Sequence, residues 1–469
     1  MRSSRGSQAK GKGLGYEIDR RVLREYDIRG IVGRGIDEGA AHVIGRSFAT
    51  RVRSGGGRRV AVGRDGRLSS PMLEAALVAG LTASGVDVVR LGVVPSPMLY
   101  WAEATLEVDA GVQVTGSHNP KDQNGFKLVL GTRPFFGEDI GELARIAAAG
   151  EWADGAGTIE QADVLDAYAG HLLSGYAGGA YRIAWDAGNG AAGPVVERLA
   201  ALLPGEHRVL FAEVDGDFPN HHPDPTEEAN LADLKRCVAD ERLDFGLAFD
   251  GDGDRIGAVD GRGRTVWGDQ ILALLAEPLL KEHPGAAIVA DVKASQALFD
   301  RIEALGGRAV MWKSGHSNIK TEMREVGAPL GGEMSGHIFF APPEGRGYDD
   351  ALYAAVRLIR AVHLSGRSLA ELIDALPQYV ATPELRFAVA AGRREAVVGE
   401  VLARLRDEGA QVDTTDGVRV KEADGWWLLR ASNTQDMLTA RAEGVDEGAR
   451  DRLVARVDAQ LAASSVRRQ

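Results

Sequence analysis

One local pattern occurs three times along the chain: a short apolar strand, a polar turn with an aspartate, and then a helical segment. The turns contain Asp65, Asp186 and Asp291, and the helical patterns cover residues 71–84, 195–203 and 295–305. The aspartates are separated by about the length of one small domain. The repeat therefore predicts three similar α/β units in series. Strands that alternate with helices favour mixed or mostly parallel sheets.

The pattern changes after about residue 376. Strand-like patterns at 385–390, 417–421 and 426–430 are combined with helical patterns at 393–408 and 448–462. This arrangement predicts a smaller α+β unit at the C-terminal end. A length of 469 residues suggests about three domains on its own. Candidate boundaries lie near residues 150–157, 260–264 and 376–384.

Charge and composition exclude several classes of protein. The formal net charge is −12, so the chain lacks the basic footprint of a nucleic-acid binder. No apolar run approaches the roughly 18 residues of a membrane helix. The only cysteine, Cys237, excludes an internal disulfide. The basic, Gly-rich and Ser-rich start lacks the apolar core of a signal peptide. We therefore expect a cytoplasmic enzyme with no nucleic-acid or membrane partner.

The strongest local signal is an apolar strand, 245–249, followed by Asp250-Gly251-Asp252-Gly253-Asp254-Arg255. Glycines let the backbone turn tightly, so the three carboxylates can converge. Converging carboxylates repel one another unless a cation lies among them, and oxygen ligands suit Mg²⁺. An EF-hand loop fails here, because Arg255 and Gly261 occupy its Gly and Glu positions. An aspartyl-phosphate phosphatase motif is a near miss, and a solvated acidic turn is the structural alternative.

A second signal is a strand that ends in Thr115-Gly116-Ser117-His118-Asn119-Pro120. The turn presents a serine, and Asn119-Pro120 fixes the turn that follows. It is not a hydrolase elbow, since Asn119 replaces the final glycine. Lys127 lies close enough in sequence to bring a cation back to a phosphate at this turn. A purely structural turn is the alternative interpretation.

Two further loops carry polar side chains suited to a sugar phosphate. Residues 331–337 are Gly-rich and contain Glu333, Ser335 and His337, which can hydrogen-bond hydroxyls and move protons. Arg430 ends an apolar strand and precedes Ala431-Ser432-Asn433-Thr434, a set suited to a phosphate. The segment Lys313-Ser314-Gly315-His316-Ser317 is ambiguous by itself.

Taken together, these segments resemble the α-D-phosphohexomutase superfamily, and most closely its bacterial phosphomannomutase/phosphoglucomutase branch. The resemblance runs in the family's order from Tyr26-Asp27-Ile28-Arg29-Gly30 through residues 92–97 and 115–120 to residues 430–434. It implies three related α/β domains and a smaller fourth around a central cleft. With a disordered arm at 1–16, the four domains would be a phosphoserine domain (17–157), a metal-binding domain (158–262), a sugar-binding domain (263–376) and a phosphate-binding domain (377–469).

The resemblance also implies roles for individual residues. Ser117 would be the phosphoserine, and with Asp250, Asp252 and Asp254 it would bind one Mg²⁺. Catalytic cations and proton-transfer groups would be Arg29, Lys127, Arg255 and His337. Substrate-binding residues would be Tyr26, Lys293, His316, Glu333, Ser335, Arg430, Ser432, Asn433 and Thr434. One departure stands out: the family usually has a residue and then Pro after this last loop, where Gln435-Asp436 stands here.

The implied activity is reversible phosphoryl transfer between C1 and C6 of mannose and glucose phosphates. It would proceed through the phosphoserine and a hexose 1,6-bisphosphate, which is both intermediate and activator. The alternatives are a phosphoglucosamine mutase, which usually has Gln where Met334 stands, a metal-dependent sugar phosphatase, and an idle sugar-phosphate-binding protein. We expect hexose phosphates as the partners and a monomer or a weak homo-oligomer.

Overall fold

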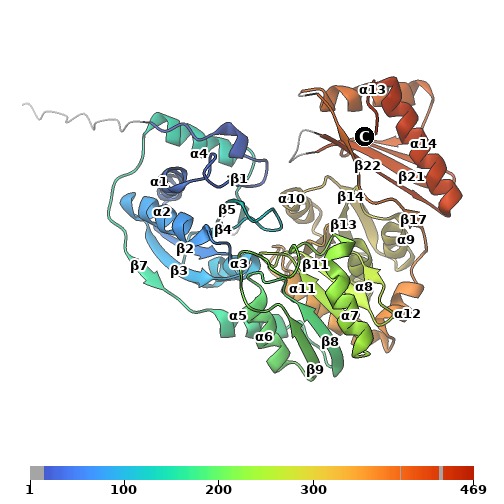
Figure 1. Cartoon of the computed structure of the whole chain (residues 1–469), viewed down its shortest axis with the longest axis horizontal. Coiled ribbons are helices and arrows are strands. Elements are labelled where there is room, and N and C mark those ends of the chain that lie inside the picture. The colour runs from blue at the N-terminus through green and yellow to red at the C-terminus, as the bar shows by residue number, and fades with distance from the viewer. Residues whose placement is uncertain (1–14, 132, 391, 433–436, 469) are drawn as a thin grey trace, which may run out of the picture. The chain divides into compact units, whose positions relative to one another are not determined.

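The computed structural model describes residues 15–131, 133–390, 392–432 and 437–468, which form two compact units, 1–164 and 165–469 (Figure 1). Most of the predicted N-terminal arm lies outside the described residues. Tyr16, which the prediction includes in that arm, donates its backbone N–H to the carbonyl of Ala147 at 2.9 Å and packs against the core. In the described part of the chain, no helix combines the length and the apolar character of a membrane span.

The first unit is one sheet with helices on both faces. Its strands are β1 (Ile28–Ile31), β2 (Arg59–Arg64), β3 (Asp87–Val93), β4 (Ala110–Val114), β5 (Gln123–Leu130), β6 (Arg133–Pro134) and β7 (Ile159–Gln161). Its helices are α1 (Glu38–Ser54), α2 (Ser70–Ala83), α3 (Ser96–Thr105) and α4 (Glu138–Ala149). The strand order is β1-β5-β4-β2-β3-β7, with β6 beside β5.

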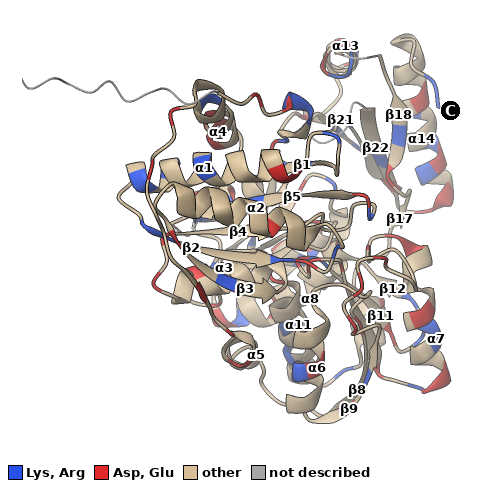
Figure 2. Ribbon diagram, turned by 60° about the vertical axis from the view of Figure 1, so that its left-hand side comes forward, with Lys and Arg blue, Asp and Glu red and all other residues tan. Residues whose placement is uncertain are grey.

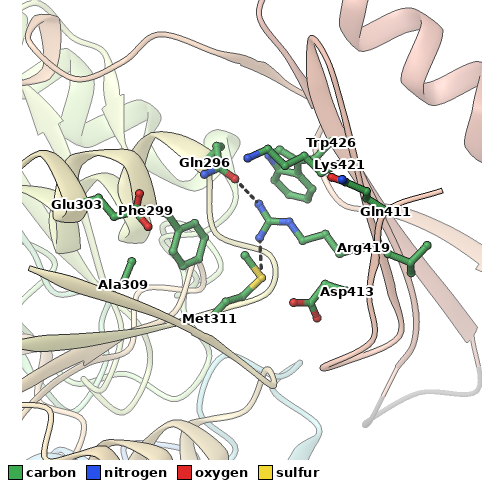
Figure 3. A pocket seen from close by; sticks show the side chains of 11 residues that line it. Gln296, Phe299, Glu303, Ala309, Met311, Gln411, Asp413, Arg419, Lys421 and Trp426 are labelled. Atoms are coloured by element: carbon green, nitrogen blue, oxygen red, sulfur yellow. Dashed lines mark hydrogen bonds between the residues drawn. The ribbon is translucent and has the colours of Figure 1, made fainter. Parts of the chain in front are cut away.

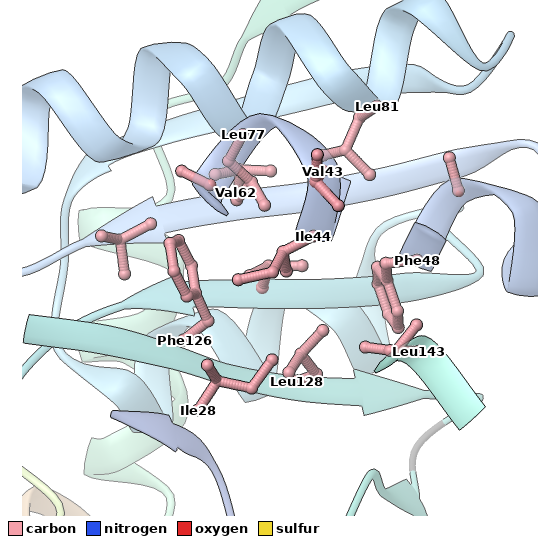
Figure 4. Packing of buried hydrophobic residues seen from close by; sticks show 14 of the residues in the cluster. Ile28, Val43, Ile44, Phe48, Val62, Leu77, Leu81, Phe126, Leu128 and Leu143 are labelled. Atoms are coloured by element: carbon pink, nitrogen blue, oxygen red, sulfur yellow. The ribbon is translucent and has the colours of Figure 1, made fainter. Parts of the chain in front are cut away.

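The core of this unit follows from alternation along the strands. Val60 and Val62 of β2 pack with Ile44 of α1 and Leu77 of α2 in one buried cluster (Figure 4). Burial of each such side chain stabilises the fold by ~1.5–3 kcal/mol. Helices α1 and α2 approach each other closely. A Cβ atom at Gly80 would lie 2.1 Å from the carbonyl oxygen of His42, so this crossing requires glycine.

The second unit contains three sheets. The first contains β8 (Tyr181–Asp186), β9 (Gly205–Leu210), β10 (Phe245–Phe249), β11 (Ile256–Asp260) and β12 (Thr265–Val266). The next contains β13 (Ala287–Asp291), β14 (Arg308–Trp312), β15 (Leu330–Gly332) and β16 (Ile338–Phe340). The last contains β17 (Val380–Ala381), β18 (Leu385–Ala388), β19 (Val412–Asp413), β20 (Val418–Glu422), β21 (Gly425–Ala431) and β22 (Met437–Gly444).

Helices cover these sheets. They are α5 (Leu165–Leu173), α6 (Gly193–Leu202), α7 (Ala232–Asp240), α8 (Gly268–Glu282), α9 (Gln296–Ala304), α10 (His316–Val326), α11 (Ala351–Ser365), α12 (Leu369–Asp374), α13 (Arg394–Asp407) and α14 (Glu447–Ala463). Basic and acidic residues are interspersed along exposed helices such as α7 and α14, as expected for solvated faces (Figure 2).

The three α/β sheets share one local topology, which confirms the repeat seen in the sequence. The strand that precedes each aspartate turn, namely β2, β8 or β13, lies between two parallel neighbours. One of these neighbours, β4, β10 or β15, pairs antiparallel with the next strand along the chain. The paired strands of the C-terminal sheet are all antiparallel, in agreement with the predicted α+β unit.

Candidate active site

The repeated topology explains where the three main motifs lie. Ser117 is in the loop between β4 and β5, the three aspartates are in the loop between β10 and β11, and Glu333 is in the loop between β15 and β16. These loops are equivalent positions in the three sheets. Polar groups at the carboxyl ends of the central strands are the usual site-forming groups of open α/β sheets.

Ser117 is held in an unusual backbone conformation. Its side chain is almost fully buried, with 2% of the residue exposed, and its φ is +50°. The backbone N–H of Ser117 donates to Oγ1 of Thr115 at 2.8 Å, and its Oγ lies 3.1 Å from Nδ1 of His118. A left-handed residue that is not glycine is uncommon and costs free energy, so the surrounding contacts must hold it.

The contacts that hold the Ser117 loop come mainly from Arg67, which the sequence reading did not single out. Its guanidinium is fully buried and donates to the Ser117 carbonyl at 2.6 Å and to the Asn119 carbonyl at 2.7 Å. It also reaches the carbonyls of Pro120 and Gln123 at 2.7 and 3.1 Å. One cation therefore gathers four carbonyls of one loop. The only sequence signal was the polar turn after β2.

Asp65 completes this scaffold. Its carboxylate pairs with the Nε of Arg67 at 3.1 Å and accepts hydrogen bonds from Oγ1 of Thr115 and the backbone N–H of Gly116. A Cβ atom on Gly116 would lie 2.5 Å from the Arg67 side chain, so glycine is needed here. The aspartate of the first repeat thus positions the serine loop.

The other predicted residues of the first unit lie on neighbouring strands. Arg29 on β1 donates to Oδ1 of Asn119 at 3.0 Å and pairs with Asp27 at 2.5 Å. Lys127 on β5 is buried and is the register partner of Gln113 on β4. Tyr26 precedes β1, and its ring centroid lies 6.4 Å from that of Phe136. Arg29 is therefore linked to the Ser117 loop through Asn119.

In the second unit, Asp250, Asp252 and Asp254 are all buried, and their carboxylates offer oxygen atoms that lie within 4.8 Å of one another. The loop is closed by hydrogen bonds from the backbone N–H groups of Asp254 and Arg255 to Oδ1 of Asp250, at 3.0 and 3.1 Å. Gly253 has a φ of +73°. Three buried carboxylates this close together are unfavourable without a cation, so the donor set fits a hard metal ion.

A chain of contacts joins this carboxylate cluster to the loop that contains Glu333. His337 places Nε2 at 3.3 Å from Asp254 and Nδ1 at 3.1 Å from Glu333. Burial by itself would lower the pKa of His337, but the two carboxylates raise it well above its usual value. Burial would raise the pKa of Glu333, but the hydrogen bond and the charge of His337 lower it. The pair is therefore an imidazolium and a carboxylate at neutral pH.

Arg255 lies beside the same group. Its Nε is 3.4 Å from Nε2 of His337. Burial opposes the charge of Arg255, yet four carboxylates raise the pKa of its guanidinium above the ordinary value. These carboxylates belong to Asp224, Asp250, Asp254 and Glu333. Arg255 is therefore a permanent cation at the metal-binding loop.

The remaining sugar-loop candidates lie around Glu333. Ser335 places its Oγ at 3.1 Å from Nδ1 of His337, and the rings of His316 and His337 lie 5.8 Å apart. Lys293 follows β13, and its Nζ is 3.8 Å from Asp291. Asp349 was not predicted; it pairs with Lys320 at 3.0 Å and lies 3.7 Å from Nδ1 of His316. The structure thus brings these predicted residues of the second unit together.

The C-terminal phosphate-loop candidates are described in part. Arg430 lies near the end of β21 and is 6% exposed, and the backbone N–H of Ser432 donates to the carbonyl of Met437 at 3.0 Å. Asn433 and Thr434, like Gln435 and Asp436, lie outside the described residues.

A cavity of about 420 Å³ lies between α9, β14 and the C-terminal sheet (Figure 3). Its central side chain is Arg419, which stacks at 3.8 Å on the ring of Trp426 and donates to the carbonyl of Val292 at 3.1 Å. Burial lowers the pKa of Arg419 to about 10. The lining contains two cations and two carboxylates, Arg419, Lys421, Glu303 and Asp413. This balanced set joins two sheets and lacks the excess charge that a phosphate site needs.

Comparison with known proteins assigns the chain to a family. Sequence models of phosphoglucomutase/phosphomannomutase match in four consecutive segments: alpha/beta/alpha domain I at 20–153, domain II at 167–263, domain III at 267–380 and the C-terminal domain at 384–460. A phosphoglucomutase from Neisseria gonorrhoeae is 42% identical over 95% of this chain and 97% of its own. The chain belongs to the phosphoglucomutase/phosphomannomutase family.

Other members of the family agree in sequence and structure. A phosphomannomutase/phosphoglucomutase from Pseudomonas aeruginosa is 42% identical over 92% of this chain and 93% of its own. A crystal structure of a phosphoglucomutase/phosphomannomutase family protein from Burkholderia thailandensis has a TM-score of 0.90 and 40% identity, over 96% of this chain and 98% of that one. The family is metal-dependent, which matches the buried acidic cluster.

Proposed function

We propose that this protein catalyses reversible phosphoryl transfer between C1 and C6 of glucose and mannose phosphates, with Ser117 as the phosphate carrier. The observation that carries the proposal is 42% identity, over nearly the whole chain, to enzymes named for one or both of these sugars. The equal identity to a phosphoglucomutase and to a phosphomannomutase/phosphoglucomutase favours activity on both sugars.

The first half-reaction starts from phosphorylated Ser117 and a hexose 1-phosphate. The P–O bond to Ser117 Oγ breaks while a P–O bond to the sugar O6 forms. The 6-hydroxyl gives its proton to a basic group of the protein, and Ser117 Oγ takes up a proton as it leaves. The product is a bound hexose 1,6-bisphosphate. After the bisphosphate turns end for end, its 1-phosphate is transferred to Ser117, and hexose 6-phosphate leaves. Such transfers depend mainly on positioning and charge neutralisation.

The carboxylates of Asp250, Asp252 and Asp254, together with an oxygen of phosphorylated Ser117, would hold one Mg²⁺. This ion supplies positive charge that offsets the charge of the transferring phosphoryl group. Arg255 adds a permanent cation beside these carboxylates. The buried, closely spaced carboxylates of this loop support the assignment.

The sugar and the second phosphate need separate contacts. Glu333 is ionised beside His337, so it accepts hydrogen bonds from the sugar O3 and O4 hydroxyls, and Ser335 adds a second polar contact. His337 is protonated and suits proton transfer or charge stabilisation. Arg430 and Ser432, with Asn433 and Thr434, would bind the phosphate that does not react, and Lys293 and His316 would contact the substrate. Arg29, Lys127 and Tyr26 would serve the phosphoserine.

These roles distribute one function to each predicted domain. The phosphoserine would belong to residues 17–157, the metal to 158–262, the sugar loop to 263–376 and the distal phosphate to 377–469. A cytoplasmic location and a monomeric or weakly oligomeric state fit this activity, because the substrates are soluble metabolites.

The proposal is tested with Ser117→Ala. The variant should lose nearly all mutase activity on glucose 1-phosphate in a coupled assay. Intact-mass measurement should show one extra phosphate on part of the wild-type protein and none on the variant. Residual activity near the detection limit fits the assignment, since other groups sometimes substitute. Full turnover by the variant would exclude Ser117 as the carrier.

The same assay separates the alternatives. Faster turnover of glucosamine 1-phosphate than of glucose 1-phosphate would identify a phosphoglucosamine mutase. Release of inorganic phosphate, with no hexose 6-phosphate formed, would identify a phosphatase.

A further inference from the structure

Arg430 does not stand alone in its turn. Asp416 lies between β19 and β20, and its Oδ2 accepts a hydrogen bond from Nε of Arg430 at 3.0 Å. The Nη2 of Arg430 forms an ion pair with the same oxygen at 2.9 Å. Both side chains are largely buried, with 7% of the Arg430 side chain and 16% of the Asp416 side chain exposed. The arginine is therefore held by a carboxylate of its own sheet.

The edge of the guanidinium that Asp416 uses is informative. A guanidinium has a side edge, Nε with one terminal nitrogen, and an end edge formed by the two terminal nitrogens. Asp416 takes the side edge, so the end edge keeps the geometry that a phosphate needs for two parallel hydrogen bonds. Nη2 is buried and, among the described residues, makes the ion pair with Asp416 without meeting the geometry of a hydrogen bond. An arginine that is fixed by its side edge in this way keeps its end edge oriented for a ligand.

The same carboxylate also reaches the neighbouring sheet. Oδ2 of Asp416 accepts a hydrogen bond from the backbone N–H of Ser314 at 3.0 Å. The next residue, Gly315, donates its N–H to Oε1 of Glu333 at 2.7 Å. Oγ of Ser314 donates to Asp291, which also accepts the backbone N–H of Met334. A continuous set of contacts therefore runs from Arg430 to the loop that contains Glu333.

We propose that Asp416 is a positioning residue for substrate binding. It orients Arg430 toward the phosphate that does not react and sets the distance between this arginine and the sugar-binding Glu333. The inference rests on the proposed function, since it takes Arg430 as a ligand of a sugar phosphate. It adds to the substrate-binding residues one residue of the turn between β19 and β20, which acts through Arg430 and does not itself contact the substrate.

The position of the contact predicts which kinetic constant changes. The phosphate that does not react is held in the same way in the bound substrate and in the transition state. A loss of such uniform binding raises KM and leaves kcat nearly unchanged. Asp416→Asn keeps the size of the side chain but removes its charge. The expected rise in KM for glucose 1-phosphate is about tenfold, as for a lost hydrogen bond between charged groups.

The test compares three proteins in the coupled assay at saturating glucose 1,6-bisphosphate: wild type, Asp416→Asn and the control Asp413→Asn. The control makes the same change of charge at the last residue of β19, where Asp413 accepts a local hydrogen bond from the Thr415 N–H. Inorganic phosphate serves as a competitive inhibitor, and its inhibition constant should rise in parallel with KM in Asp416→Asn alone.

A rise in KM with kcat within about twofold of wild type, and no change in the control, supports the inference. An unchanged KM overturns it, even where the melting temperature falls, because Asp416 would then serve only to neutralise a buried arginine. A fall in kcat at constant KM also overturns it. If Asp416→Asn does not fold, Asp416→Glu replaces it, since an added methylene group displaces the carboxylate, and the same outcomes apply. Wild-type protein without mutase activity would refute the proposed function instead.

Discussion

At the scale of single residues, two buried charged groups explain how the reactive loops are held. Arg67 gathers the carbonyls of the Ser117 loop, and the aspartates at 250, 252 and 254 crowd their negative charges into another loop. The first group is balanced by Asp65 and by four carbonyls. The second lies beside Arg255 and His337, and a bound cation would add further positive charge among its three carboxylates. We therefore expect a substitution of Arg67 to lower the stability of the fold. The loss of one carboxylate from the second group should raise it when no metal is bound.

Arg67→Lys should remove most activity while keeping the charge. An ammonium group cannot present the planar fork that reaches four separate carbonyls, so the loop around Ser117 loses its shape. We expect mutase activity to fall by at least about tenfold and the melting temperature to fall by several degrees, since buried hydrogen-bond acceptors lose their donor. The control is Arg64→Lys. Arg64 lies close to Arg67 in the sequence, but it pairs with Glu74, at 3.1 Å. Near-normal activity of Arg67→Lys would show that the loop does not need this scaffold.

The effect of Asp252→Asn on stability should change sign when metal is added. In EDTA the variant should melt at a higher temperature than wild type, because one of three repelling carboxylates is gone. In Mg²⁺ it should melt lower, because metal affinity falls by at least about tenfold with one anionic ligand lost. Titration calorimetry measures the affinity directly. Asp244→Asn, outside the cluster, should show neither effect, and unchanged Mg²⁺ affinity in Asp252→Asn would make the cluster purely structural.

At the scale of elements, the three α/β sheets repeat one arrangement of strands, and the loops at the equivalent positions carry different side chains. In each α/β sheet an aspartate stands at the end of the central strand or directly after it, and each sheet carries a candidate site loop after the parallel neighbour of that strand. In the first sheet Asp65 binds the serine loop, and in the third Asp291 accepts the backbone N–H of Met334 in the sugar loop at 3.2 Å. In the second sheet Asp186 instead binds His221 at 3.0 Å. The same position thus supports two of the candidate site loops directly.

Local patterns predicted these elements well, because strand and helix periodicity is local. The expected helix at 71–84 is α2 at Ser70–Ala83, and the expected strand at 426–430 is β21 at Gly425–Ala431. Contacts made across many residues were not predictable. Arg67 and Asp416 act on loops far along the chain, and nothing in their own turns shows this. Met334, where a phosphoglucosamine mutase would usually have Gln, places its sulfur against Arg441 of the C-terminal sheet.

Helix α11 begins at a carboxylate whose charge is unfavourable. Asp350 caps this helix by accepting the Tyr353 N–H at 2.8 Å, and it accepts the Tyr168 hydroxyl of α5 at 2.9 Å. Burial, and to a lesser extent Asp349, raise the pKa of Asp350 to about 7. A carboxyl whose pKa rises on folding stabilises the folded state only while it keeps its proton. Its contribution is therefore lost as the pH rises from about 4 to about 7.

Asp350→Asn should make stability less dependent on pH. The variant lacks the ionisation, so its stability relative to wild type should improve by about 3 kcal/mol between pH 5 and pH 8. Thermal melts at both pH values measure the difference. Asp446→Asn is the matched control: it is also a helix N-cap, accepting the Ala449 N–H at 2.7 Å, but it is exposed. A difference between wild type and Asp350→Asn that does not vary with pH would contradict a raised pKa.

At the scale of the whole molecule, the proposed contacts include none with the substituent at C2 of the sugar. Glucose and mannose 1-phosphates differ only at C2, whereas Glu333 and Ser335 are assigned to O3 and O4. We therefore expect kcat/KM values for the two sugars within about a hundredfold of each other, and a clearly lower value for glucosamine 1-phosphate. Glu333→Ala should weaken both good substrates alike. Loss of mannose activity alone would show that Glu333 reads C2, and dual specificity would then be wrong.

The buried Arg67 also has a consequence for synthesis of the chain. It precedes the carbonyls that it binds by 50 to 56 residues. During translation its side chain therefore leaves the ribosome before any of these carbonyls. Domains generally fold as units, with the N-terminal one first. A nascent chain that stops before β5 therefore has Arg67 and three of its four carbonyl partners but lacks the strand that pairs with β4, and we expect the Ser117 loop to take its final shape only when that strand is added.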